Sequence, residues 1–444
     1  MGASLSATKR RPSRAATTLW PVIALSIALM LVTRTFQYFP GMGLVQEAGI
    51  VAAPVALAIL VMRHRRVVGR TRGFELYVLF LMVAMPAWSG VAALSAYGQP
   101  LFFGVLAWRG YWLSAFALLV LYAGRARLIT TSDVDRAFVA CAWATLTLFL
   151  LMTLLLVPAN FIDYGPGFIE DRHTEGYRFK FNAVFTIYAM FHYAVRALRE
   201  SRPQWYLASA PFALFLFGSA GGRTLTVSVI LAVLVVLLHW GGWARVWRGA
   251  AGLAVLLIVV IGVAAVSAPA ATSERLDKFA DAFAVFSLDA DLIDDASAAS
   301  RALQVLVALP MIEEHPFVGN GRISSQWVDD GYSGYLNTYF FPDDIGVLGM
   351  VLQYGLIGTA LFAAQFVFGW RYARRNKRAR ANVASDTSET YLAYLAISSI
   401  ATGSFVMFPE FALLLIAVLV AHDESGGGRN GFVPAYRFLS KATK

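Results

Sequence analysis

The sequence predicts an all-α membrane protein, a polytopic bundle of about twelve transmembrane helices. Of its 444 residues, 58% are hydrophobic and 14% aromatic, whereas only 14% are charged. The mean hydropathy is +0.61, and a water-soluble chain carries about a quarter of charged residues. Apolar stretches recur along the chain, and about twenty apolar residues are enough for one helix to cross a bilayer.

The predicted spans follow from the positions of these apolar stretches. The basic start from Lys9 to Arg14 is typical of a signal peptide, but no small-residue cleavage site follows it, so we interpret the first stretch as an uncleaved span. The last two spans are short and are separated by Pro409. The spans are expected near residues 17–38, 44–62, 74–96, 101–123, 137–157, 181–198, 205–220, 224–240, 249–270, 345–370, 390–408 and 410–422.

Basic residues predict the orientation of the chain. They gather after alternate spans, around residues 63–72, 125–136, 196–202, 245–248 and 371–380, and the positive-inside rule makes these loops and both termini cytoplasmic. This asymmetry explains the net charge of +10, so nucleic acid is not expected as a partner.

The same topology divides the chain into four parts. Residues 1–270 are predicted to hold spans one to nine, 271–344 a large periplasmic loop, 345–422 spans ten to twelve, and 423–444 a cytoplasmic tail. Within the loop, apolar residues at helical spacing predict an amphipathic helix from Leu276 to Phe286. A second helix is predicted from about Ala299 to Glu314.

Two carboxylates lie where the large loop runs into the tenth span. Asp343 and Asp344 directly follow Pro342, and a carboxylate near hydrocarbon is costly unless a cavity, a partner or a proton relieves it. One interpretation is a solvated helix cap, because Asp is a favoured N-cap residue. The other is a cap that also takes part in chemistry.

The predicted outer half of the molecule contains few cations, and each is a candidate ligand for an anion. Taken singly, each has an ordinary explanation as a snorkelling side chain or a member of an ion pair. Taken together, they place planar guanidinium groups where a phosphate is bound bidentately. A membrane-embedded diphosphate is the partner that fits such a set, which consists of Arg109, Arg178, Lys180, Arg223, Arg301 and Arg322.

Neither a nucleotide fold nor a metal site is expected, and no cofactor is predicted. The glycine-rich turn from Gly218 to Arg223 lacks the Lys-Ser/Thr pair of a phosphate loop. His315 has no second histidine at ligand spacing, so we interpret it as structural or as a hydrogen-bond partner of the substrate. The acidic run from Asp289 to Asp295 lacks the glycine and terminal glutamate of a calcium loop.

From about Arg178 to Glu410 the chain resembles the bacterial O-antigen ligase and polysaccharide polymerase superfamily. Arg301 is followed, a helix length later, by the turn HPFVGNG at residues 315–321, and the next apolar helix supplies Gly355 and Gly358. Weaker matches lie at residues 178–182 and 219–223. Asp344 holds the position at which the ligases place a histidine, which favours an exopolysaccharide or O-antigen polymerase.

The resemblance implies a GT-C-like helical fold and an inverting, metal-independent glycosyl transfer. The donor would be an undecaprenyl-diphosphate-linked oligosaccharide at the periplasmic face of the inner membrane, embedded in membrane lipid. Arg178, Arg223 and Arg301 would neutralise the leaving diphosphate, and Asp344 would accept the proton of the acceptor hydroxyl. A flippase and chain-length regulators are the implied protein partners.

Other functions stay open at this point. A ligase would transfer the finished glycan to another acceptor. A transporter would also explain Arg109 and a carboxylate at a helix start, although the sequence shows no inverted repeat. A scaffold role is the third alternative, and the large outer loop suits a catalytic lid better than either of these two.

Overall fold

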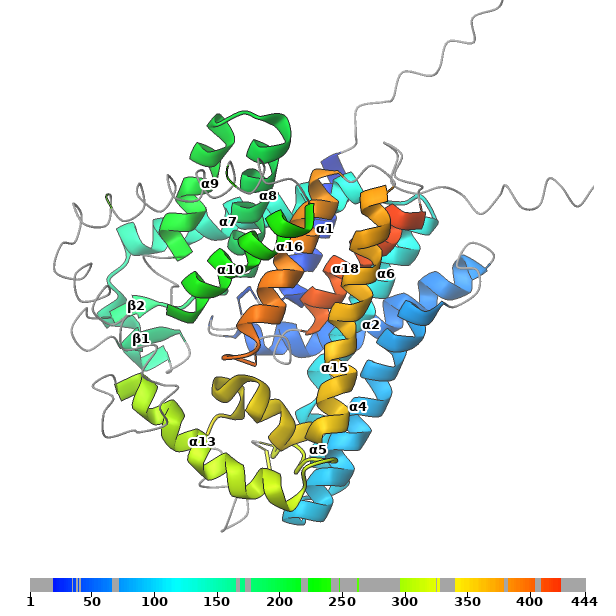
Figure 1. Ribbon diagram of the computed structural model, residues 1–444, viewed down its shortest axis with the longest axis vertical. Helices are drawn as coiled ribbons and strands as arrows, with labels where there is room; N and C mark the ends of the chain where they lie inside the picture. The colour runs from blue at the N-terminus through cyan, green and yellow to red at the C-terminus, as the bar shows by residue number, and fades with distance from the viewer. Residues whose placement is uncertain are drawn as a thin grey trace, which may run out of the picture.

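The computed structural model shows a predominantly helical protein, which confirms the predicted helical fold, with one short β-hairpin in addition (Figure 1). The hairpin consists of β1 (Ile169–Asp171) and β2 (Tyr177–Phe179), paired antiparallel. The structure describes residues 19–33, 35–36, 39, 41–65, 72–164, 168–171, 177–216, 223–240, 247, 262, 296–324, 326–327, 340–378, 382–403 and 409–424.

The first half of the chain forms long helices and one broken helix. Between α4 and α7, α5 and the segment Arg109–Arg125 meet at an angle of 46°, so the predicted span 101–123 is bent where Trp108 and Arg109 lie. The elements are α1 (Leu19–Val32), α2 (Met42–Arg63), α4 (Gly73–Tyr97), α5 (Leu101–Ala107), the 3-10 helix η1 (Arg109–Ser114), α6 (Ala115–Arg125) and α7 (Thr131–Leu155).

The second half begins after a 3-10 turn and the hairpin and ends in the helix at the centre of the molecule. The second loop helix predicted from the sequence is present as α13. The elements are η2 (Pro158–Tyr164), α8 (Val184–Glu200), α9 (Gln204–Phe215), α10 (Arg223–Trp240), α13 (Ala296–Glu314), the 3-10 helix η6 (Pro342–Ile345), α15 (Gly346–Arg378), α16 (Val383–Ser398) and α18 (Pro409–Glu424).

Eleven of the predicted spans overlap with a helix. The twelfth, 249–270, lies outside the described residues except for residue 262, and the helix expected at 276–286 lies wholly outside them. Among the described residues, four helical segments are long and apolar enough to cross a membrane alone, and the bent pair around Trp108 is a fifth candidate. These segments are those of an integral membrane protein. The number of twelve spans stays a prediction.

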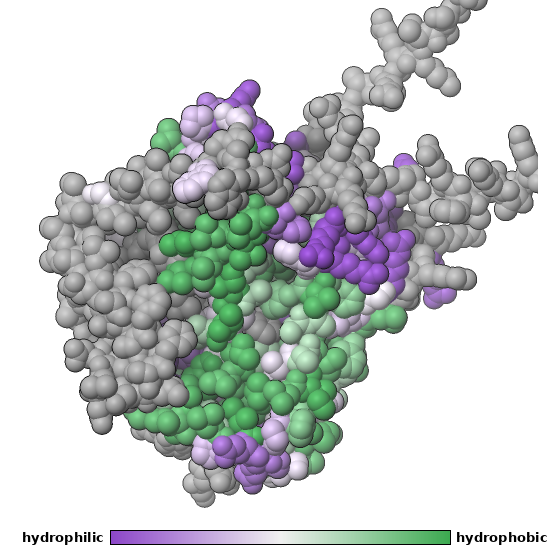
Figure 2. Space-filling model, viewed as in Figure 1, coloured by the Kyte–Doolittle hydropathy of each residue, from purple (hydrophilic) through white to green (hydrophobic). Residues whose placement is uncertain are grey.

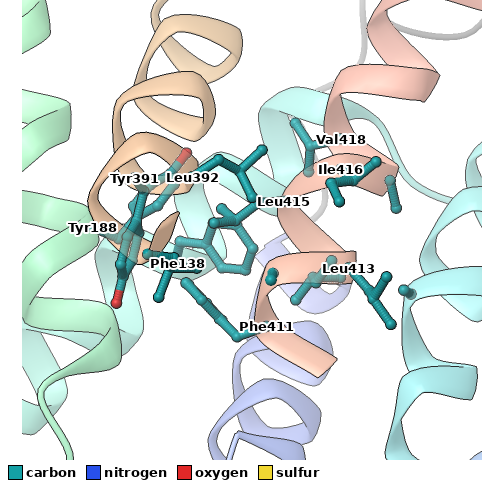
Figure 3. Packing of buried hydrophobic residues seen from close by; sticks show 14 of the residues in the cluster. Phe138, Tyr188, Tyr391, Leu392, Phe411, Leu413, Leu415, Ile416 and Val418 are labelled. Atoms are coloured by element: carbon teal, nitrogen blue, oxygen red, sulfur yellow. The ribbon is translucent and has the colours of Figure 1, made fainter. Parts of the chain in front are cut away.

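The last helix, α18, is the centre of the bundle rather than a marginal span. Every residue from Pro409 to His422 is buried, and α18 packs against α6, α7, α15 and α16. Figure 3 shows Phe411 and Leu415 beside Phe138, Tyr188 and Tyr391. A helix that is apolar on all sides needs such a buried position, which explains why a short helix is stable there.

The described ends of three predicted cytoplasmic loops, at Arg72, Arg125 and Arg375, form ion pairs with the end of α18. The Nη2 atom of Arg125, at the end of α6, lies 2.6 Å from carboxylate oxygens of both Glu75 and Glu424. Nearby, Arg375 pairs with Asp423 at 3.6 Å. Figure 2 shows an apolar zone between hydrophilic groups at the top and bottom of the view. This grouping agrees with the charge asymmetry, and the side of the membrane stays a prediction.

Candidate functional site

The site is built around a break in α15 at Gly355. Its backbone angles, φ 64° and ψ −177°, are far from helical and are accessible almost only to glycine. The break interrupts the hydrogen-bond ladder of a helical segment that is long and apolar enough to cross a membrane. Such backbone is tolerated at membrane depth only where other protein groups satisfy it.

The turn at residues 315–321 supplies these groups. The backbone N–H groups of Asn320 and Gly321 donate to the carbonyls of Leu352 and Gln353 at 2.7 and 2.9 Å. In return, the N–H of Leu356 donates to the carbonyl of Pro316 at 2.8 Å. The HPFVGNG turn and the glycine of α15 are therefore two halves of one docked element.

The other face of the turn rests on α4. The indole N–H of Trp88 donates to the carbonyl of Val318 at 2.9 Å. The backbone N–H of Arg322 donates to Ser89 Oγ at 2.9 Å, and its carbonyl accepts from Gln99 Nε2 at 3.1 Å. The main chain of Arg322 is thereby held by Ser89 of α4 and by Gln99, which follows α4.

A polar cavity of about 190 Å³ opens beside this element. It lies between α2, η1, η6 and the segment after the turn. Three of the predicted site residues, Arg109, Arg322 and Asp343, line it, although they are far apart in the sequence. The other polar and aromatic lining residues are Gln46, Glu47, Trp108 and Tyr111.

Arg322 is seated on an aromatic ring in the cavity. Its guanidinium carbon lies 4.6 Å from the centre of the Trp108 ring, a cation–π distance. Trp108 is itself fixed, because its indole N–H donates to Ser89 Oγ at 2.7 Å. The Nη2 atom of Arg322 lies 3.9 Å from Asp343 Oδ2, which is an ion pair but too long for a hydrogen bond. The guanidinium N–H groups of Arg322 therefore make no hydrogen bond with Asp343.

Arg109 is the second cation of the cavity, and its geometry is different. Its Nε and Nη2 atoms donate to the two carboxylate oxygens of Glu47 at 2.8 and 2.6 Å. Its Nη1 atom donates to the carbonyl of Leu106 at 2.8 Å. All three guanidinium nitrogens therefore have partners, and Glu47 takes the edge with which arginine binds carboxylates and phosphates bidentately.

Two buried tyrosines connect the cavity to the break in α15. The hydroxyl groups of Tyr111 and Tyr354 are 3.0 Å apart, and Tyr354 directly precedes Gly355. Tyr111 also stacks on Trp108, with 4.6 Å between the ring centres. The position of the cavity wall is therefore coupled to the docked turn.

The remaining predicted residues lie around this centre. The side chain of Asp344, on η6, is exposed. The cavity lining does not include Arg301 or His315, both of which are described; His315 contributes its carbonyl to the turn, 2.9 Å from the N–H of Gly319.

For the other two predicted cations, the structure describes only the backbone. Arg178 is the middle residue of β2 and Arg223 is the first residue of α10. Their side chains lie outside the described part of the structure. Their roles at a diphosphate therefore stay predictions.

The neighbours of the Asp343 side chain are not those expected for a helix cap. Among the described residues, no side-chain hydrogen bond caps η6 at Phe341. The carboxylate of Asp343 faces Arg322 instead, and the side chain is 17% exposed. Of the two acidic residues, Asp343 lines the cavity and Asp344 does not.

Sequence reasoning missed several residues of the site. Glu47 is the only charged residue of the predicted span 44–62, and this signal was sufficient to single it out. Ser89, Trp108 and Tyr111 carry no comparable signal, because polar hydroxyls and aromatic rings are common in membrane helices. Only the packing of α4 against η1 shows that they support Arg322.

Comparison with known proteins agrees with the predicted resemblance. No curated protein matches the chain. Independently of these comparisons, the described residues contain no group of three or more His, Cys, Asp or Glu side chains that is placed to hold a metal ion. A family model described as O-antigen ligase matches residues 206–363, a stretch that contains the docked turn, Arg322, Asp343 and Asp344. Over that stretch the chain is similar to O-antigen ligases, which supports the predicted resemblance.

Proposed function

We propose that the protein is a polysaccharide polymerase. It transfers a glycan from undecaprenyl diphosphate to the end of another lipid-linked repeat unit. The observation that carries this proposal is the polar cavity, which combines two arginines and two carboxylates beside the docked turn of the matched region. The family match supports a glycosyltransferase-like enzyme of lipid-linked glycans.

In this proposal, Arg322 and Arg109 bind the diphosphate of the donor. Each charged hydrogen bond contributes about 1.5–3 kcal/mol, and this stabilisation increases as the glycosidic bond breaks and negative charge collects on the leaving group. Asp343 orients Arg322, which also rests on Trp108. Arg178 and Arg223 are proposed as further ligands of the same diphosphate.

Asp344 is proposed as the general base. Its side chain is exposed, so an acceptor hydroxyl can approach it, whereas Asp343 lies in the cavity and faces Arg322. Asp344 takes the proton of that hydroxyl while the oxygen attacks the anomeric carbon, and the diphosphate leaves with the bonding electrons. Direct attack of this kind inverts the anomeric centre.

The cavity is proposed to open to the periplasmic side of the inner membrane. Glu47 lies near the start of α2, and the basic residue Arg63 ends the same helix. The cavity therefore lies toward the end of the bundle away from the basic loops, and the positive-inside rule assigns those loops to the cytoplasm. Both termini are then cytoplasmic.

A ligase has the same donor and differs in its acceptor. The aspartate at residue 344, where the ligases place a histidine, favours the polymerase. Removal of the protein from its host separates the two functions. If a single lipid-linked repeat unit accumulates, the protein is a polymerase; accumulation of finished lipid-linked polymer would identify a ligase.

A second experiment separates the enzyme from a transporter. Purified protein in detergent is mixed with lipid-linked repeat units, and the products are separated by length. We expect longer lipid-linked chains together with free undecaprenyl diphosphate. Absence of both products from folded, full-length protein would contradict the proposal, because a transporter needs two compartments and makes neither.

A further inference from the structure

We propose that α13 is an interfacial helix, whose outward side lies among the acyl chains of the membrane leaflet beside the cavity. The partner of this surface is the lipid itself. The inference does not depend on the proposed reaction, because it concerns how the helix is seated rather than what the cavity binds. It places part of the predicted periplasmic loop in the membrane surface.

One side of α13 is packed against the helix bundle. Ala308 is buried and belongs to an apolar cluster with Ile345 of η6 and Leu352 of α15. The side-chain oxygen of Gln304 accepts a hydrogen bond from the backbone N–H of Phe341 at 3.2 Å. These contacts attach α13 to η6 and α15, so the direction of its opposite side is defined.

The opposite side carries a stripe of exposed apolar residues. Leu303, Leu306 and Leu309 are 55%, 47% and 36% exposed, and Pro310 is exposed as well. Residues three or four apart lie on the same face of a helix. A helix that packs on one side and faces water on the other carries polar residues on its outer side, whereas α13 carries leucines there. A contiguous exposed patch of this kind marks an interaction surface.

The stripe faces lipid because it continues into a surface that crosses the membrane. After α13 the chain enters the turn at residues 315–321, where Phe317 is 62% exposed. The backbone N–H of Ile357 donates to the carbonyl of Phe317 at 3.3 Å. Leu356 and Ile357 are exposed on the segment Pro342–Asn376, which is long and apolar enough to span a bilayer. The lipid that covers this segment therefore also reaches the end of α13.

Charged residues mark where the stripe ends. Glu313 and Glu314 are exposed in the last turn of α13, and a carboxylate is costly in hydrocarbon. Figure 2 shows hydrophobic surface over α13, next to hydrophilic surface at the lower end of the view. Among the described segments that could span a membrane, α13 does not occur. A helix with these properties lies in the plane of the interface, with its apolar side about 5–10 Å deep.

The test measures fluorescence quenching of single labels on the full-length protein in lipid nanodiscs. In a protein without Cys141, one cysteine at a time is introduced and coupled to the small fluorophore bimane. One quencher is a nitroxide on the acyl chains of the lipid, and the other is iodide in the water. With Leu303→Cys and Leu306→Cys we expect loss of fluorescence with the nitroxide lipid and little loss with iodide.

Two further positions calibrate the measurement. Glu314→Cys is the matched control on the same helix, and its label should be quenched by iodide rather than by the nitroxide lipid. Ile357→Cys is the reference for a label in lipid, because Ile357 lies on the segment that can span the bilayer. All four natural side chains are exposed, so that the label need not displace packed groups.

The outcomes distinguish lipid from water and from protein. Quenching of both leucine positions by the nitroxide lipid, close to that at residue 357, supports the proposal. Quenching by iodide to the level of residue 314 would place the stripe in water and overturn it. Protection from both quenchers would show that protein covers the stripe, either a second copy or another part of this chain, and would overturn it as well. None of these results affects the proposed reaction, because the labelled residues do not line the cavity.

Discussion

Gly319 and Gly355 lie back to back where the turn at residues 315–321 enters the break in α15. A Cβ atom on Gly319 would overlap the backbone nitrogen of Gly355, and one on Gly355 would overlap the carbonyl of Phe317. Both glycines also have positive φ, 77° and 64°. Two motifs that look independent in the sequence therefore require each other in space.

This relationship predicts the effect of Gly355→Ala. Backbone strain alone should lower the free energy of unfolding by about 1–3 kcal/mol, and the clash with Phe317 should add to it. The measurement is thermal unfolding of the purified protein in detergent. Gly43→Ala in α2 is the control, since a Cβ there meets nothing within 4 Å. Equal stability of the two variants would show that the turn does not depend on the break.

Most helices of this protein could be predicted from the sequence, because the length of an apolar stretch is a local property. The position of α18 could not, since a buried and a lipid-facing apolar helix have the same composition. The site was predictable only in part. Arg109, Arg322 and Asp343 were separate candidates, and their meeting depends on the bend at Trp108 and on the docked turn. Neither feature has a local sequence signal that gives its geometry.

The ion pairs at the end with the basic loops predict a stability effect. Glu75 is fully buried and its charge is neutralised by Arg125, 2.6 Å away. Arg125→Met should destabilise the protein by about 3–5 kcal/mol, because it leaves a buried carboxylate without its cation. Adding Glu75→Gln should restore part of the loss. Thermal unfolding of the three proteins measures this, and an unaffected Arg125→Met protein would contradict the interpretation.

The seat of Arg322 on Trp108 predicts that lysine is a poor substitute. Arg322→Lys keeps the charge but loses the planar fork and its stacking on the ring. The KM for the lipid-linked donor should rise at least about tenfold, the equivalent of one charged hydrogen bond. Arg374→Lys is the matched control, because Arg374 lies 5.3 Å above Trp370 near the far end of α15. Similar kinetics for both variants would remove Arg322 from the donor site.

The orientation can be tested with described, exposed residues at opposite ends. In a protein without Cys141, we expect Glu314→Cys at the end of α13 to react with an impermeant thiol reagent applied to spheroplasts. Arg202→Cys, between α8 and α9, should react only after the membrane is permeabilised. The readout is the mass of the labelled protein. Labelling of residue 202 alone from outside would reverse the topology and place the cavity on the cytoplasmic side.

The two neighbouring aspartates give the sharpest test of the chemistry. Asp344→Asn keeps the size of the side chain and removes the proton acceptor, so turnover should fall by a factor of about 10² to 10⁴. Asp343→Asn should have a smaller effect and act mainly on the donor KM, because Asp343 pairs with Arg322. Asp344→His should recover part of the activity where the imidazole can accept the same proton. Initial rates of polymer formation, measured at matched protein levels, show which of the two aspartates is the base. A normal rate with Asp344→Asn and a large loss with Asp343→Asn would transfer the role of base to the residue inside the cavity.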